Sequence, residues 1–296
     1  MSTAGASLHS ERVCVIGLGL IGGSVVHALR ANGFSGEIAG VVADLEQARQ
    51  ARELGLVDAP TTDIAAAVAN ATLVVVAVPI GAMADVFAQI APALADDAVV
   101  TDTGSTKLSV IREAEVCLGE RMGRFVPGHP ISGTERSGLD AGFATLFAGR
   151  RVILTPTPAT DSDALARVAA LWHAVGARVS EMDGAHHDEV LAATSHLPHL
   201  LAYTLVDTLA RMAERTEIFE YAAGGFADFT RIASSSPSLW ADIVTANHDA
   251  ILPVLDRYIG DLDAVRSAIA GGERDRLAAI FTRAKTARDG FATGQT

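Results

Sequence analysis

The amino-acid sequence predicts an α/β protein in which a doubly wound, mostly parallel sheet is followed by an all-helical C-terminal domain. Two observations carry this prediction. In the first half of the chain, short aliphatic runs alternate with helix-like segments, which is typical of a parallel sheet covered by helices on both faces. After about residue 180 the strand-like runs stop and long helical periodicities begin.

Length and composition agree with this organisation and exclude several classes of protein. The chain has 296 residues, of which 49% are hydrophobic and 20% are charged, so it has ample material for a packed core. The chain has 23 Lys and Arg and 35 Asp and Glu. The resulting net charge of −12 argues against nucleic acid or an anionic membrane surface as a partner. The two cysteines, Cys14 and Cys117, cannot build a disulfide framework, which favours a cytoplasmic protein. Residues 1–10 lack the pattern of a signal peptide, and we interpret them as a flexible tail.

Six runs in the first half are candidate strands, because each is β-branched or aliphatic and is bounded by Gly, Pro, Asn or Asp. They span residues 13–16, 38–42, 73–78, 99–101, 125–126 and 152–154. Residues 24–32, 46–54 and 82–94 place apolar side chains at three- and four-residue intervals, which predicts helices between the strands.

Four long helical periodicities fill the second half, over residues 188–213, 218–233, 239–257 and 274–289. A serine-rich stretch at 234–238 separates the second from the third. There Ser236 is expected to cap the next helix and Pro237 to occupy its first position. Pro198 predicts a kink in the first of these helices. We therefore expect two domains, over residues 11–180 and 181–296.

A glycine-rich turn joins the first candidate strand to the first candidate helix. Gly17 permits a tight turn, Gly19 lets the backbone approach a pyrophosphate, and Gly22 lets the helix pack closely on the strand. The helix N-terminus then offers unpaired N–H groups to the phosphates. Glycine turns also occur for steric reasons alone, but this one heads an alternating α/β pattern. It therefore predicts a Rossmann-type dinucleotide-binding domain over residues 11–180.

An acid at the end of the second candidate strand bears on the choice of dinucleotide. Asp44 lies 22 residues beyond Gly22, where a carboxylate accepts hydrogen bonds from ribose hydroxyls and repels a 2′-phosphate. The alternative is that Asp44 only caps the helix that begins near Leu45. We predict NAD as the cofactor, with NADP as the alternative.

Three further groups of residues, taken with the glycine turn, carry a resemblance to a known family. They are TDTGSTK at 101–107, GHPISGTERSG at 128–138, and SHLPH at 195–199 with DFTRIA at 228–233 and Trp240. In this order they resemble the prephenate/arogenate dehydrogenase family of tyrosine biosynthesis, over about residues 12–260. The resemblance implies that a small molecule, prephenate or arogenate, loses CO₂ and transfers a hydride to the nicotinamide. It also implies that the helical domain over 181–296 binds substrate and forms a homodimer, although an apolar helix face alone could equally be internal core.

His129, in the Gly-His-Pro motif, matches the catalytic histidine of the family. A neutral imidazole that accepts a hydrogen bond from the substrate hydroxyl would stabilise the positive charge that grows as hydride leaves. The resemblance implies Ser105 as a second catalytic residue, hydrogen-bonded to His129 or to that hydroxyl. The residues alone also allow a loop hydrogen bond for His129, and an N-cap role for Ser105 in a helix beginning near Thr106.

Arg231 is the implied clamp for a substrate carboxylate, because a guanidinium binds a carboxylate through two hydrogen bonds. Asp228 lies three residues earlier and could orient it, and an ordinary surface ion pair is the alternative. The resemblance places further side chains around the substrate, namely Thr134, Glu135, His187, His196, His199 and Trp240. Of these, Glu135 could instead be a solvated loop carboxylate and Trp240 a buried core residue. At least one of the three histidines is expected to have a structural role.

The implied cofactor contacts comprise Gly17, Leu18, Gly19, Leu20, Ile21, Gly22, Asp44, Val78, Pro79 and Thr103. The spacing of His196 and His199 could be half of a metal site, with His187 or Glu189 as a third ligand. No cysteine or second histidine pair at a familiar spacing completes it, and we predict no metal.

Two other functions would share the glycine turn. A β-hydroxyacid or imine reductase of similar layout would carry a catalytic lysine on the interdomain helix, and no lysine occurs between Lys107 and Lys285. A protein that senses NAD(H) without turnover would have no use for Ser105, His129 and Arg231 together. The sequence therefore predicts a decarboxylating dehydrogenase.

Overall fold

The computed structural model describes residue 8, residues 11–213 and residues 215–293. The tail predicted at residues 1–10 thus lies outside the described residues, apart from Leu8. The chain forms two compact units, Met1–His248 and Asp249–Thr296. The domain boundary predicted near residue 180 lies inside the first unit and stays a prediction.

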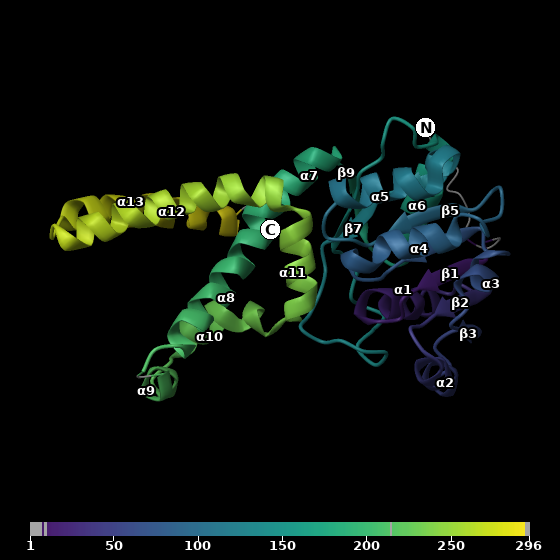
Figure 1. The fold of residues 1–296 in the computed structure, drawn as a ribbon, viewed down its shortest axis with the longest axis horizontal. Helices are drawn as coiled ribbons and strands as arrows, with labels where there is room; N and C mark the ends of the chain where they lie inside the picture. The colour runs from purple at the N-terminus through teal and green to yellow at the C-terminus, as the bar shows by residue number, and fades with distance from the viewer. Residues whose placement is uncertain (1–7, 9–10, 214, 294–296) are drawn as a thin grey trace. The chain divides into compact units, whose positions relative to one another are not determined.

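A six-stranded parallel sheet forms the centre of the first unit (Figure 1). The predicted doubly wound sheet is confirmed, because the chain fills one half of the sheet outward from β1 and then returns to fill the other half from β4. Ligands of such sheets bind at the carboxyl ends of the strands, where the order reverses. The strands in spatial order are β3 (Ala59–Thr61), β2 (Ile38–Val41), β1 (Val13–Ile16), β4 (Leu73–Val76), β5 (Val99–Asp102) and β6 (Phe125–Val126).

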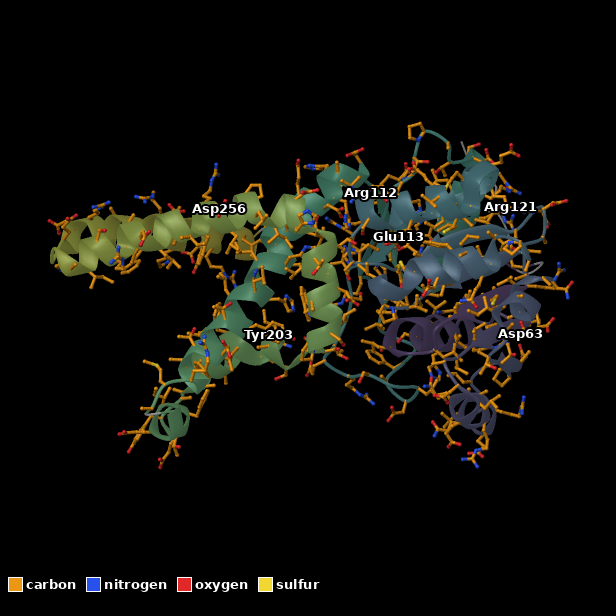
Figure 2. All side chains as sticks on the ribbon, viewed as in Figure 1. Asp63, Arg112, Glu113, Arg121, Tyr203 and Asp256 are labelled. Carbon is orange, nitrogen blue, oxygen red and sulfur yellow. The ribbon has the colours of Figure 1, made fainter. Side chains whose placement is uncertain are left out.

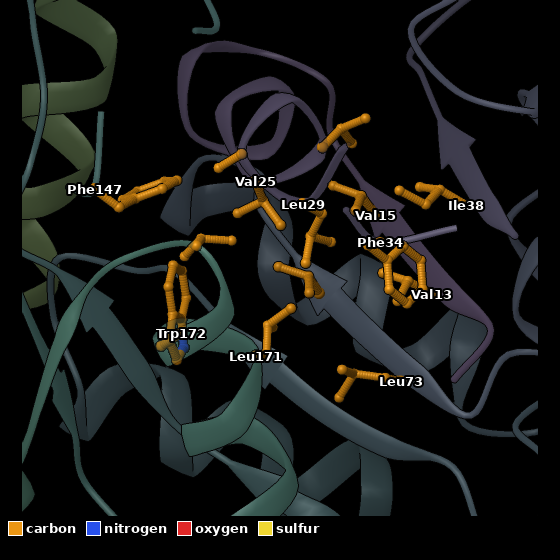
Figure 3. Close-up of a cluster of buried hydrophobic side chains, with 14 of the residues drawn as sticks. Val13, Val15, Val25, Leu29, Phe34, Ile38, Leu73, Phe147, Leu171 and Trp172 are labelled. Atoms are coloured by element: carbon orange, nitrogen blue, oxygen red, sulfur yellow. The ribbon is translucent and has the colours of Figure 1, made fainter. Parts of the chain in front are cut away.

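Helices cover both faces of this sheet, because successive strand residues point to opposite sides. Val13 and Val15 of β1 pack into one apolar cluster, and Cys14 and Ile16 pack into another. Figure 3 shows the first cluster, in which side chains of α1 and α6 meet the strands. Helices α3, α4 and α5 contribute to the second cluster. The helices are α1 (Leu20–Ala31), α2 (Leu45–Glu53), α3 (Ile64–Val68), α4 (Met83–Ile90), α5 (Leu108–Leu118) and α6 (Ser162–Ala174).

A second, three-stranded sheet follows β6 and carries the candidate catalytic histidine. Strand β7 (Gly128–Pro130) pairs antiparallel with β8 (Arg151–Leu154), which pairs parallel with β9 (Arg178–Glu181). Only the run at 152–154 was predicted from the sequence. Strand β7 is short and ends in proline, and β9 is only half-buried, so neither has the aliphatic pattern of a core strand.

The predicted helix over 188–213 is interrupted by a π-helical turn. Helix α7 (Gly184–Leu191) passes through this turn (Ala192–His196) into α8 (Leu197–Ala210). Pro198 has no N–H to donate to the Thr194 carbonyl, and the wider turn lies directly before it. The helix is therefore disturbed near Pro198, as predicted. The disturbance takes the form of a π turn that contains His196.

The remaining predicted helices of the first unit are shorter than expected. Residues 218–233 fold as α9 (Arg215–Glu220) and α10 (Gly224–Thr230), followed by a 3₁₀ turn (Arg231–Ser234). Helix α11 (Pro237–Ala246) begins as predicted, because the Ser236 hydroxyl accepts a hydrogen bond from the Leu239 N–H and Pro237 occupies the first position. It ends at Asn247, so the predicted helix over 239–257 is divided.

The second unit consists of helical segments. Helix α12 (His248–Ala270) extends into it from the first unit, and α13 (Arg274–Thr293) follows after a short turn. Gly272 has a φ of +66° in that turn, which glycine adopts without strain. Within the described ranges, no helix is long and apolar enough to cross a membrane.

Candidate active site

The turn between β1 and α1 has the geometry of a phosphate-binding loop. Gly17 has a φ of +93°, and a Cβ there would lie 2.4 Å from the Ala77 carbonyl oxygen. A Cβ on Gly22 would lie 1.9 Å from the Gly17 carbonyl oxygen, so α1 can start this close to β1 only with glycine. Gly19 is the N-cap of α1 without a capping side chain, and a Cβ there would meet nothing within 4 Å. The helix N-terminus thus faces open space, which fits the pyrophosphate of a dinucleotide.

The other predicted cofactor contacts lie near this turn or at neighbouring strand ends. Val78 and Pro79 follow β4 and Thr103 follows β5, and the Val78 side chain lies against Gly17. Asp44 caps α2, where its carboxylate accepts hydrogen bonds from the Gln47 backbone N–H at 2.8 Å and side-chain amide at 3.0 Å. The capping role of Asp44 is therefore correct, and its contact with ribose stays a prediction.

Three cofactor candidates on α1 and before it differ in exposure. The Leu18 side chain is buried in the apolar cluster, so only its backbone could face a dinucleotide. Leu20 and Ile21 are half-buried at the start of α1.

His129 lies on β7, opposite Ile153 of β8, and belongs to a buried hydrogen-bonded cluster. Its Nδ1 lies 2.9 Å from Nε2 of His187 on α7. The Nδ1 of His187 in turn lies 2.8 Å from Oδ1 of Asp188. His187 is fully buried and Asp188 almost so. A histidine, a second histidine and a carboxylate thus form one continuous chain of hydrogen bonds.

Asp188 also caps helix α5. Its two carboxylate oxygens accept hydrogen bonds from the backbone N–H groups of Lys107 and Leu108, at 2.8 and 2.9 Å. The N-cap alternative for Ser105 is therefore wrong, because α5 begins at Leu108 and its cap comes from α7. Ser105 is half-buried, and in the described part of the chain His129 Nδ1 pairs with His187, not with Ser105. A catalytic role for Ser105 stays a prediction.

A buried ion pair fixes the segment next to His129. The Lys107 ammonium donates hydrogen bonds to the Asp102 carboxylate and, at 2.7 Å, to the Gly128 carbonyl oxygen. The Asp102 carboxylate also accepts hydrogen bonds from the Gly128 and Gly104 N–H groups, at 3.1 and 2.7 Å. Both side chains of the pair are fully buried. The end of β5 is therefore tied to the start of β7, one residue before the histidine.

Burial lowers the pKa of two histidines at this site, His129 and His196. Burial, helped by the nearby His187, Lys107 and His196, holds the pKa of His129 well below its ordinary value. Burial likewise lowers the pKa of His196 to about 4. The Asn247 side-chain amide lies 3.0 Å from both His196 Nδ1 and the Asp188 carbonyl oxygen. At neutral pH the rings of His129 and His196 therefore carry no positive charge.

A second group of side chains, more exposed than the first, includes the predicted carboxylate clamp. The ring of His199 stacks on Trp240 with 3.6 Å between centroids, and the edge of His196 faces the same tryptophan. Burial and the nearby Arg231 lower the pKa of His199, against a hydrogen bond with the Ser195 carbonyl oxygen that raises it. Arg231 and Glu135 form an ion pair at 3.6 Å, with 65% and 50% of their side chains exposed. Five predicted substrate residues are thus linked by contacts or charge.

Comparison with known proteins identifies the family. Residues 25–181 match the family model described as prephenate dehydrogenase, nucleotide-binding domain, and residues 183–283 match prephenate dehydrogenase, dimerization domain. The chain belongs to the prephenate dehydrogenase family. The two matches together cover most of the chain, and the resemblance proposed from its motifs is correct.

Individual prephenate dehydrogenase relatives agree over almost the whole length. Cyclohexadienyl dehydrogenase of Zymomonas mobilis is 44% identical over 94% of this chain and 95% of its own length. Prephenate dehydrogenase of Bacillus subtilis is 35% identical over 96% of this chain and 77% of its own. A crystal structure of prephenate dehydrogenase from A. aeolicus, in complex with hydroxyphenyl propionate and NAD⁺, superimposes with a TM-score of 0.88. It is 36% identical and covers 96% of this chain and 99% of its own. The chain is therefore an oxidoreductase that catalyses an oxidative decarboxylation in tyrosine biosynthesis.

One prediction about the site is untested and another is wrong. Arg231 lies in the 3₁₀ turn directly after α10 and pairs with Glu135, and an orienting role for Asp228 stays a prediction. Trp240 is not a buried core residue but is half-buried, and it lines a largely apolar cavity of about 290 Å³ with Tyr203 and Leu200. Figure 2 shows Tyr203 in the space between α8 and α11, where its hydroxyl donates a hydrogen bond to the Ser235 carbonyl oxygen.

The remaining site residues are Thr134, which was predicted from the sequence, and four residues that were not predicted. Thr134 is exposed, and its hydroxyl accepts a hydrogen bond from the Arg136 N–H. The sequence did not predict a role for Asp102, Lys107, Asp188 or Asn247. A charged pair in the TDTGSTK motif, directly after an aliphatic strand, was the available signal for Asp102 and Lys107. Asp188 and Asn247 act through contacts across 51 to 81 residues, which no local pattern reveals.

Proposed function

We propose that this protein oxidises prephenate or arogenate with NAD as the hydride acceptor. The observation that carries the proposal is the position of His129, a buried histidine whose pKa is held well below its ordinary value. The glycine turn contacts Ala77 after β4, β4 pairs with β5, and Asp102 at the end of β5 binds Gly128. The dinucleotide loop and the histidine therefore lie at the carboxyl ends of neighbouring strands.

The reaction needs orientation and charge stabilisation more than proton transfer. The bond between C1 and its carboxylate breaks, CO₂ leaves, and the electron pair enters the ring. The C4–H bond breaks at the other end of the ring, and NAD supplies the hydride acceptor. Prephenate, as a dianion, thus yields the 4-hydroxyphenylpyruvate anion, CO₂ and a hydride, with no net gain or loss of a proton. Positive charge grows on C4 and its hydroxyl, and the protein must stabilise it.

The two groups of side chains suit the two ends of this substrate. A neutral His129 accepts a hydrogen bond from the C4 hydroxyl, and Ser105 contributes a second polar group beside it. Arg231 binds a substrate carboxylate, for which a guanidinium fork is well matched. His199 and Trp240 form the wall against the ring, and Glu135 is the counter-charge for the ammonium group that arogenate carries in place of the prephenate ketone.

NAD is the proposed cofactor, in preference to NADP. The open glycine turn accommodates a pyrophosphate, and the Asp44 carboxylate at the end of β2 would repel a 2′-phosphate. The A. aeolicus structure that superimposes on this chain contains NAD⁺. In a hydride-transfer assay we expect kcat/KM for NAD to exceed kcat/KM for NADP. In the Asp44→Ala variant we expect the ratio of these two values to be smaller. A wild-type preference for NADP would contradict this assignment.

A homodimer is the proposed assembly. Residues 183–283 match the dimerization domain of the family, and α12 within them exposes Leu252, Ile259, Leu262 and Ile269 along one face. We expect light scattering to give the mass of two chains, and Ile259→Glu to shift it toward one. Val116→Glu, which alters an exposed apolar residue on α5, is the matched control. A cytoplasmic location, without nucleic-acid partners, rests on the two free cysteines and the net charge.

The decisive experiment is turnover by the purified protein. With NAD and prephenate, or NAD and arogenate, we expect absorbance of reduced nicotinamide to rise together with release of CO₂ and an aromatic product. Comparison of kcat/KM for the two substrates then assigns the preferred one. A protein that binds NAD but turns over neither substrate would contradict the proposal and favour an NAD(H) sensor. Turnover without CO₂ release would favour another dehydrogenase of similar layout.

A further inference from the structure

His187 and Asp188 are buried next to His129, and the proposed reaction has not yet assigned them a role. We propose that His187 and Asp188 are positioning residues that hold His129 in one tautomer, with its proton on Nδ1 and the Nε2 lone pair directed to the substrate hydroxyl. The inference rests on the proposed function, because it concerns how the histidine of that reaction is prepared. It is carried by the geometry of three consecutive hydrogen bonds.

Both carboxylate oxygens of Asp188 accept hydrogen bonds, which bears on the charge of this residue. Its Oδ1 lies 2.8 Å from both the Lys107 N–H and His187 Nδ1, and its Oδ2 lies 2.9 Å from the Leu108 N–H. Backbone N–H groups can only donate, so both oxygens act as acceptors. Burial alone would raise the pKa of Asp188, but the hydrogen bonds from His187, Leu108 and Lys107 bring it below its ordinary value. Asp188 is therefore an ionised carboxylate at neutral pH.

The ionised Asp188 carboxylate fixes which nitrogen of each histidine ring carries the proton. An ionised carboxylate accepts hydrogen bonds only, so Nδ1 of His187 carries the proton of that ring. In neutral His187, Nε2 is then the acceptor, and the contact of 2.9 Å requires His129 to donate from Nδ1. Neutral His129 is left with a bare Nε2, which is the form that accepts a hydrogen bond from a hydroxyl. The opposite tautomer would present a donor there and would oppose the growing positive charge.

The arrangement also stabilises charge during the reaction. As positive charge grows on the substrate hydroxyl, its proton is drawn toward His129 Nε2, and the charge is shared along hydrogen bonds that end on the Asp188 carboxylate. These groups are buried and already aligned, so little reorganisation is needed. The carboxylate has a second task, since it also caps α5. Changes at His187 therefore test the tautomer more cleanly than changes at Asp188.

The test compares two substitutions of His187. His187→Leu removes the acceptor for His129 Nδ1–H and leaves the Asp188 cap of α5 in place. His187→Gln retains a carbonyl that can accept from His129 and an amide that can donate to Asp188. We expect the Leu variant to lose about 10- to 100-fold in kcat with KM for substrate and NAD within about twofold, and the Gln variant to recover most of kcat. Equal activity of the Leu variant and the unsubstituted enzyme would overturn the inference, as would an equal loss in the Leu and Gln variants.

His186 supplies the matched control. It is the preceding residue of α7, its side chain is 62% exposed, and it lies 3.7 Å from Glu189. His186→Leu and His186→Gln repeat the same chemical changes on the outer side of the helix, and we expect both to keep the unsubstituted kcat. If His186→Leu lowers kcat as much as His187→Leu, the effect belongs to the helix and the inference fails.

A spectroscopic measurement tests the tautomer directly and does not depend on the folding of the His187 variants. In protein with ¹⁵N-labelled histidine, assigned by comparison with His129→Asn, we expect His129 to show a protonated Nδ1 and an unprotonated Nε2. A proton on Nε2 of the unsubstituted protein would overturn the inference, because His187 would then donate to His129. Failure of the proposed function would look different, as absence of turnover with both substrates while the expected tautomer is observed.

Discussion

Two groups of side chains at the candidate active site are built in opposite ways. The inner cluster (His129, His187, Asp188 and His196) is buried, and its hydrogen bonds measure 2.8 to 3.0 Å. The outer wall (Glu135, His199, Arg231 and Trp240) is half-buried or exposed, and its ion pair has a separation of 3.6 Å with both side chains at least half exposed. One group is fixed before any ligand binds, and the other can exchange partners.

This difference predicts a division of labour. Buried groups that are already aligned stabilise charge that develops only in the transition state, which raises kcat. An exposed ion pair contributes little to stability, so Arg231 can leave Glu135 for a substrate carboxylate at low cost. Interactions of that kind bind the ground state and the transition state alike, and they lower KM. Substitutions in the two groups should therefore change different kinetic constants.

The largest effect is expected from His129→Asn in the inner cluster. Loss of the imidazole removes the acceptor for the substrate hydroxyl, and groups of this kind contribute about 10²- to 10⁴-fold to the rate. We expect kcat to fall by that factor while KM changes by about twofold or less, measured by steady-state absorbance of reduced nicotinamide. If KM rises by the larger factor and kcat is retained, His129 belongs with the substrate-binding groups and the division fails.

Acid should destabilise the inner cluster through His196. Its pKa falls from 6.5 to about 4 on folding, so the unfolded chain binds the extra proton between these values. The contribution of His196 to the free energy of unfolding is therefore fully present above about pH 6.5. About 3 kcal/mol of it is lost as the pH falls toward 4. Urea unfolding at pH 7 and pH 4.5 should show the loss, and His196→Asn should reduce the difference between the two values.

His186→Asn is the control for that measurement, because His186 is exposed. It should leave the pH dependence of the unfolding free energy as it is in the unsubstituted protein. If His196→Asn and His186→Asn have the same pH dependence, the buried histidine does not carry the effect.

The sequence was a better guide to the sheet than to the inner cluster. The runs at 13–16 and 125–126 match β1 and β6, because a buried parallel strand has a continuous aliphatic pattern. Strands β3 and β7 escaped notice because they are three residues long and contain proline. The expected dinucleotide turn was recognisable because its steric demands fall on glycines that are adjacent in sequence.

The inner cluster could be predicted only in part, since its order comes from tertiary contacts. His129 was found from the Gly-His-Pro motif, but its partner on α7 lies 58 residues away. For His187 the sequence left open a contact with substrate or a structural role, and the structure buries it fully, with Nε2 2.9 Å from His129 Nδ1. Neither the capping of α5 by Asp188 nor the π turn before Pro198 leaves a periodic trace in the sequence.

In the outer wall, Arg231→Ala should raise KM for the substrate by about 10- to 100-fold, because one charge-assisted contact is worth about 1.5 to 3 kcal/mol. We expect kcat to stay within about threefold, since the inner cluster is intact. The KM of Arg231→Lys should lie between those of the unsubstituted enzyme and Arg231→Ala, because lysine keeps the charge but loses the planar fork. Arg211→Ala, which removes an equally exposed arginine paired with Asp207 on α8, is the control and should leave KM unchanged. A loss confined to kcat would place Arg231 with the inner cluster.

The smallest effect is expected from Glu135→Gln, and its direction depends on the substrate. With prephenate, removal of the competing carboxylate frees Arg231, and KM should fall by about twofold to fivefold, the range of an exposed ion pair. With arogenate, the ammonium group loses its counter-charge, and KM should rise by a similar factor. Parallel steady-state assays with both substrates measure the two changes. Opposite signs would show that Glu135 distinguishes the substrates through their charged ends, and equal changes would show that it only holds Arg231 in place.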